Sequence, residues 1–179
     1  MLNKKLWDMA LIRPLNGIAP KIGEDTFIAE TATIIGDVEI GDNCSIWYGA
    51  VLRGDVNSIR IGNRVNIQDN AVIHTTYQKS TTIVEDDVSI AHNAVVHGAT
   101  LKTGCLIGIG AIVLDHAVIG EGAIIAANSV VLNGTEVEPG SIYAGVPAKF
   151  VKKVDEKMAV DYNKRIASNY LMYKKWYEE

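Results

Sequence analysis

The sequence is poor in cysteine and in long apolar runs, and each shortage excludes a class of protein. Two cysteines among 179 residues cannot form the disulfide framework typical of small secreted domains. No uninterrupted apolar run reaches roughly 18 residues, so we expect no membrane span. The first residues lack an unbroken apolar core and a small-residue cleavage site, which argues against a signal peptide. We therefore expect a cytoplasmic protein that does not enter the membrane.

Basic charge and aromatic side chains are also scarce. The chain has 17 Lys and Arg against 21 Asp and Glu, a net charge of −4, with no basic block, which disfavours a nucleic-acid partner. Hydrophobic residues make up 48% of the chain but aromatic residues only 7%, so the core is aliphatic. A chain of this length forms one domain, which buries about 70% of its unfolded surface.

An internal repeat dominates the sequence. An aliphatic residue recurs every six positions, and the fourth residue after it is mostly small or β-branched. The register breaks twice and slips by one residue after Val96, then continues from Leu101 to Tyr143. The first run of aliphatic positions is Ile22, Ile28, Ile34, Ile40, Ile46 and Leu52.

A period of six fits neither an α-helix nor simple strand alternation. It is typical of an all-β solenoid, a parallel β-helix in which three hexapeptide rungs make one triangular coil. The aliphatic residue and the small residue point inward, and successive coils lie about 4.8 Å apart. The general rule for parallel crossovers would make the winding right-handed.

The two ends of the single domain differ from the repeat. We expect an N-terminal arm over residues 1–20, the β-helix over 21–149 and a C-terminal amphipathic α-helix over 150–179 that packs along its side. Mixed charge on both faces of this helix disfavours a membrane-surface role. Its apolar positions recur at helical spacing: Val154, Met158, Tyr162, Ile166, Tyr170 and Tyr173.

The repeat assigns the histidines to positions on the coils. Arg53, His74 and His97 each follow an inward aliphatic residue at the same place on different coils, so we expect them to stack on one wall. His92 falls near a corner and projects away from this pair. Three parallel chains could bring His92 of one chain onto the pair of its neighbour, so that a homotrimer closes with three identical sites. His116 falls in an exposed turn.

Three converging imidazoles with open positions are the ligand set of a catalytic zinc site. Gln68 is expected to point outward on the face that presents His92, where its amide could hold water or a bicarbonate oxygen. Arg53 could pair with Asp55 or Asp69 across a subunit interface. The alternative is that these are solvated turn residues whose ion pairs contribute little.

The two cysteines occupy inward small positions. Cys44 and Cys105 lie on the same wall about three coils apart, roughly 14 Å by strand spacing. This separation exceeds the ~7 Å Cα limit for a disulfide, so we expect two buried free thiols.

Four motifs carry a resemblance to a known family: R-G-D at 53–55, N-I-Q-D-N at 66–70, I-H ending at His74, and A-H-N-A-V-V-H-G at 91–98. With the hexapeptide rungs, over essentially the whole chain, the sequence resembles the gamma-class carbonic anhydrases. It is most similar to the bacterial carbonic-anhydrase-like hexapeptide proteins. The resemblance implies a left-handed β-helix and a homotrimer. It also implies that His74, His92 and His97 bind zinc, or else iron or cobalt, between subunits.

The resemblance further implies roles for six polar residues. By this resemblance Gln68 orients the metal-bound hydroxide or the substrate, and Asn66 lines the pocket. Arg53, Asp55 and Asp69 would form a salt-bridge network between subunits. Tyr143 is the tyrosine that would approach the metal.

One departure from the family concerns proton transfer. The founding enzymes carry glutamates in the loop after the first metal histidine and beside the Arg-x-Asp motif. Here the loop at residues 75–81 has no carboxylate, and Val56 follows Asp55. Slow proton transfer to bulk water would limit turnover. We therefore expect slow catalysis, another proton route or another substrate.

The function expected from the resemblance is reversible hydration of CO2 to bicarbonate by a metal-bound hydroxide, a lyase reaction. The alternative is an acyl-CoA-dependent acyltransferase, which would need only one histidine, His92 or His97, as base. A third possibility is a metal-binding protein without turnover. Fold alone cannot choose among them, but three histidines with Gln68 and Arg53 exceed what an acyltransferase needs.

Overall fold

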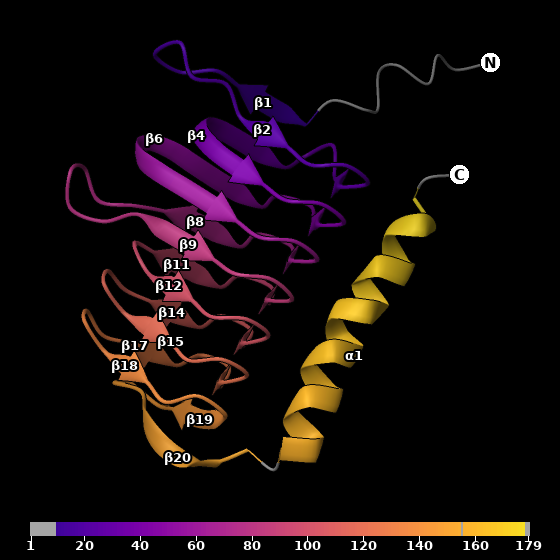
Figure 1. Cartoon of the computed structure of the whole chain (residues 1–179). Coiled ribbons are helices and arrows are strands. Elements are labelled where there is room, and N and C mark those ends of the chain that lie inside the picture. The colour runs from indigo at the N-terminus through magenta and orange to yellow at the C-terminus, as the bar shows by residue number, and fades with distance from the viewer. Residues whose placement is uncertain (1–9, 155, 178–179) are drawn as a thin grey trace.

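The computed structural model of the chain describes residues 10–154 and 156–177. Over these residues the chain is a parallel β-helix of about seven turns, wound left-handed as in hexapeptide-repeat proteins, with one α-helix beside it (Figure 1). The predicted fold class is therefore confirmed, including the handedness that the resemblance implied against the general crossover rule.

Three flat faces surround the core, and we number them in chain order. Two of them share one sheet of twelve strands, and the third is a sheet of eight. Face 1 is formed by β1 (Leu11–Arg13), β4 (Thr33–Ile40), β6 (Val51–Ile61), β8 (Val72–His74), β11 (Val95–His97), β14 (Ile112–Val113) and β17 (Val130–Val131). Face 2 holds the second halves of β4 and β6, with β2 (Lys21–Ile22), β9 (Thr82–Val84), β12 (Thr100–Leu101), β15 (Val118–Ile119) and β18 (Glu136–Val137).

Face 3 is the eight-stranded sheet and ends in the only antiparallel pairing among the strands that the structure describes. In β20 (Lys149–Lys153) the chain reverses and pairs with β19 (Ser141–Ala144). This pairing covers the strand edge that the last rung would otherwise leave open. The face consists of β3 (Phe27–Ile28), β5 (Ser45–Ile46), β7 (Asn66–Ile67), β10 (Ser89–Ile90), β13 (Leu106–Ile107), β16 (Ile124–Ile125), β19 (Ser141–Ala144) and β20 (Lys149–Lys153).

The core is the stack of inward rungs that the six-residue period predicts. On face 1 the inward side chains lie in register on successive strands and are fully buried: Ile34, Leu52, Ile73, Val96, Val113 and Val131. Cys44 and Cys105 are buried free cysteines, as predicted. His116 is exposed in a corner with a φ of 60°, a left-handed conformation that is uncommon for residues other than Gly but in which His, Asn and Asp are enriched.

The ends of the domain differ in detail from the expected boundaries. Within the expected arm, β1 pairs in parallel with β4. The helix α1 (Glu156–Lys175) begins later than residue 150, because Lys149–Lys153 are used in β20. Residues 1–9 of the expected arm, and the side chains of Met158 and Tyr162, lie outside the described part. No helix in the described residues is long and apolar enough to cross a membrane.

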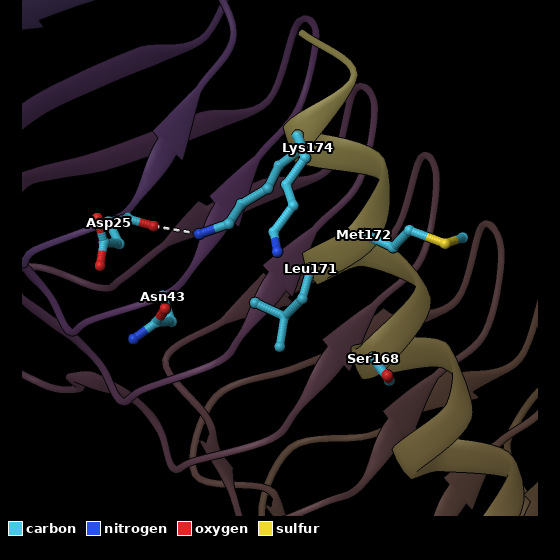
Figure 2. A pocket seen from close by; sticks show the side chains of 7 residues that line it. Asp25, Asn43, Ser168, Leu171, Met172 and Lys174 are labelled. Atoms are coloured by element: carbon cyan, nitrogen blue, oxygen red, sulfur yellow. Dashed lines mark hydrogen bonds between the residues drawn. The ribbon is translucent and has the colours of Figure 1, made fainter. Parts of the chain in front are cut away.

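Helix α1 runs back along the side of the β-helix toward the N-terminal turns (Figure 1). Aromatic rings pack between the helix and face 3. The ring of Trp47 lies 5.3 Å from that of Tyr170 in the helix and 5.5 Å from that of Tyr177 just after the helix. Near the end of the helix the buried Lys174 ammonium donates to the Asp25 carbonyl, beside a cleft of about 570 Å³ (Figure 2). Side chains of the helix therefore cover the outside of face 3.

Candidate metal centre

Two histidines stack on the outside of face 1. β8 and β11 pair in parallel with His74 opposite His97, as the repeat predicts. The ring centroids lie 5.1 Å apart, close to the spacing of adjacent strands. The nitrogen atoms His74 Nδ1 and His97 Nε2 face each other at 3.1 Å. Two imidazole nitrogens of one chain thus converge on one point.

Each histidine has a carboxylate behind its ring. Asp55 Oδ1 lies 3.0 Å from His74 Nε2, and Asp115 Oδ2 lies 2.9 Å from His97 Nδ1. An ionised carboxylate only accepts hydrogen bonds, so each of these ring nitrogens carries the proton. The opposite nitrogen of each neutral ring then carries a lone pair. The two nitrogens that face each other are therefore both acceptors.

Two acceptors at 3.1 Å repel each other unless a proton or a metal ion lies between them. Two nitrogens bound to a tetrahedral zinc at about 2.0–2.1 Å lie roughly 3.3 Å apart. A carboxylate on the outer nitrogen is also the usual support of a metal-binding histidine. The pair therefore fits two of the ligands of zinc, iron or cobalt. Within the described residues of a single chain, no group of three or more potential ligands gathers around one point.

His92 lies apart from this pair, at the corner between β10 and β11. Its Nδ1 is 2.7 Å from Asp69 Oδ2, and its side chain is 40% exposed. The Tyr170 hydroxyl of helix α1 lies 3.5 Å from His92 Nε2. His92 thus resembles the other two in having one nitrogen on a carboxylate, while its other nitrogen faces the Tyr170 hydroxyl. The helical period identified Tyr170 only as a packing residue, and nothing in the sequence pointed to its place at His92.

Arg53 and Asp55 form an ion pair within one chain. Arg53 Nη1 lies 2.5 Å from Asp55 Oδ2, so the carboxylate bridges Arg53 and His74. Burial opposes ionisation of Asp55, but hydrogen bonds from Arg53 and His74 hold the pKa of this carboxyl below its usual value. Pairing of Arg53 with Asp69 across an interface stays a prediction.

The two predicted amide residues lie together on face 3. Gln68 Nε2 donates to Asn66 Oδ1 at 3.0 Å, and Asn66 Nδ2 donates to Ser89 Oγ at 2.7 Å. Gln68 is only 4% exposed, so its amide is not presented to solvent. Tyr143 is separated from this group by β10, β13 and β16 along the face, and its ring packs against Phe150 at 6.0 Å.

The stacked six-residue rungs define a hexapeptide-repeat protein. A family model described as bacterial transferase hexapeptide (six repeats) matches residues 19–54 and 98–133. A solved hexapeptide transferase family protein from Anaplasma phagocytophilum is 42% identical with a TM-score of 0.88, over 93% of this chain and 98% of that one.

Two named relatives narrow the family. A carbonic anhydrase of Geobacillus kaustophilus is 44% identical over 82% of this chain and 80% of its own length. The mitochondrial gamma carbonic anhydrase 2 of Arabidopsis thaliana is 40% identical over 86% of this chain. The chain spans 56% of the length of that plant protein. The chain belongs to the gamma-class carbonic anhydrase family.

Proposed function

We propose that this chain is a carbonic anhydrase-like enzyme that reversibly hydrates CO2 to bicarbonate at a metal held between subunits of a homotrimer. The observation that carries the proposal is the pair of lone-pair nitrogens on His74 and His97, each backed by a carboxylate. His92 of the partner subunit completes the set. A bound divalent metal, zinc or else iron or cobalt, supplies a Lewis acid that makes water nucleophilic near neutral pH.

The character of the three faces supports the trimer. Face 3 is covered by α1, and the outward row of face 2 begins with the charged residues Lys21, Glu39 and Arg60. Face 1 instead presents a row of partly exposed β-branched side chains beside the histidine pair. They pair in register along the face: Val51, Val72, Val95, Ile112 and Val130.

An uncovered apolar row of this kind is a surface that association buries. If a second copy packs its corner at His92 against this row, the same contact repeated three times closes a ring. The separation of His92 from the other two histidines within one chain then becomes a requirement of the site. Each subunit gives two ligands to one centre and one ligand to the next.

The polar residues around the histidines have distinct tasks in this proposal. Asp55 and Asp69 fix which ring nitrogen of His74 and His92 carries the proton. Burial raises the pKa of Tyr170 to about 12, so this hydroxyl stays uncharged next to the corner that holds His92. The hydrogen bond to Asn66 holds the Gln68 amide in one orientation. Slow turnover remains expected from the absence of a carboxylate in residues 75–81.

The first test is the metal content of protein purified without chelator, followed by stopped-flow CO2 hydration. We expect about one metal per chain, lost in His74→Ala, His92→Ala and His97→Ala but retained in the exposed control His116→Ala. If metal is bound but CO2 is not hydrated, the chain is a metal-binding protein without turnover. No metal in the wild type, before or after reconstitution, would overturn the proposal and favour acyl-CoA transfer.

A mixing experiment tests whether the site is shared. His74→Ala and His92→Ala subunits, each inactive alone, are unfolded together and reassembled in equal amounts. Random cyclic assembly places an intact pair next to an intact His92 in about one quarter of the sites. Recovery of about a quarter of the wild-type metal is expected. No recovery from correctly assembled trimers would mean that each site lies within one chain.

A further inference from the structure

The loop after His74, residues 75–81, contains no carboxylate, but the carboxylate of Asp115 on a later coil contacts this loop. Asp115 lies in the turn after β14, 39 residues beyond Thr76. Its Oδ2 accepts from His97 Nδ1 at 2.9 Å, and its Oδ1 accepts from Thr76 Oγ1 at 2.9 Å. Ser80 Oγ donates to the same oxygen.

These contacts hold the loop at residues 76–80 against the Asp115 carboxylate. The Thr76 backbone amide donates to Ser80 Oγ at 3.0 Å, so the Ser80 hydroxyl bonds both to the backbone of Thr76 and to Asp115. The Asp115 carboxylate thus accepts hydrogen bonds from three donors, and one of them is the ring of His97.

Gly98 provides the space for this arrangement. A Cβ at Gly98 would lie 2.1 Å from Ser80 Oγ and 2.3 Å from Asp115 Oδ1, and the φ of Gly98 is +59°. Any larger residue would displace the serine, the carboxylate or both, in addition to the backbone strain. The glycine directly after His97 thus allows the carboxylate to lie between the loop and the imidazole.

We propose that Asp115 is a positioning residue of the metal centre, which fixes the tautomer and orientation of His97 and clamps residues 76–80 to it. The inference rests on the proposed function, because the metal would bind the nitrogen of His97 opposite Asp115. Asp55 has the same relation to His74 from an earlier coil. Supporting carboxylates of this type typically change metal affinity by about 10–100-fold when they are replaced.

The test compares Asp115→Asn with Asp87→Asn. Asp87 is a matched control because it is also a corner aspartate in an ion pair, with Arg64 at 2.7 Å, outside the histidine site. Metal affinity is measured by competition with a chelating dye after folding and trimer assembly are verified. We expect Asp115→Asn to weaken binding about 10–100-fold and Asp87→Asn to change it less than about twofold.

A second readout does not require metal. In protein labelled with ¹⁵N-histidine, NMR of the metal-free wild type should show His97 protonated at Nδ1, and Asp115→Asn should shift its tautomer equilibrium. If the wild type takes up no metal, the proposed function fails, and the tautomer alone decides on Asp115. An unchanged tautomer, or equal metal affinities in two folded variants, would overturn the positioning role.

Discussion

Replacement of Ile73 by alanine tests the inward register next to the His74–His97 pair. Ile73 is fully buried in β8, between Leu52 and Val96 of the adjacent rungs. Alanine removes three carbon atoms, which costs about 2.4 kcal/mol in transfer free energy at ~0.8 kcal/mol each. The cavity left in a stack held by backbone pairing adds about 1 kcal/mol, since the rungs cannot collapse into it. We expect the free energy of unfolding to fall by about 3–4 kcal/mol.

Ile83 is the matched control for this substitution. It is the central residue of β9, points outward on face 2 and is 41% exposed. Ile83→Ala should cost less than about 1 kcal/mol, mainly in strand propensity. Urea unfolding followed by far-ultraviolet circular dichroism, at one fixed subunit concentration, measures both. Equal losses for Ile73→Ala and Ile83→Ala would refute the inward register.

Three further predictions concern the coils. Gly108→Ala should destabilise the protein by more than about 2 kcal/mol in thermal unfolding, because its Cβ would lie 2.6 Å from a backbone oxygen of the next coil. Gly122→Ala, with open space but a φ of +63°, should cost only about 1–2 kcal/mol. Cys44 and Cys105 should not react with a thiol reagent at pH 8 until urea unfolds the chain, because burial raises the pKa of both thiols, that of Cys44 to about 11. A hydrogen bond from the Asn63 backbone amide lowers the pKa of Asp86. The contribution of the Asp86 carboxylate to stability is therefore present above about pH 4 and is lost as pH falls through the lowered value. Asp86→Asn should flatten the acid limb of a plot of stability against pH.

The six-residue period predicted most of the fold because each rung repeats the same inward side chain. The stacking of His74 on His97 followed from the same count, since residues at equivalent places on adjacent coils must lie side by side. The separate position of His92 followed as well, because a residue near a corner points away from the flat face. These predictions needed only the local repeat.

The remaining features depend on contacts that no local pattern records. Asp115 contacts Thr76 because the loop after His74 leaves the repeat and lies beside a later coil. Tyr170 reaches His92 only because the helix returns along face 3. The same helix lies over face 3, on which Gln68 is only 4% exposed. Contacts between segments far apart in the sequence, rather than the period, decide these positions.

The stacking of the histidine pair on neighbouring strands also limits how the centre can vary. The 5.1 Å between the two rings is set by the hydrogen-bonded spacing of the backbone, which is the same at every rung of the solenoid. Substitutions on other coils therefore have little means to change the backbone spacing under these two side chains. The orientation of the rings depends instead on the carboxylates of Asp55 and Asp115. Two histidines placed on any other pair of adjacent rungs would start from the same backbone spacing but would lack these two carboxylates.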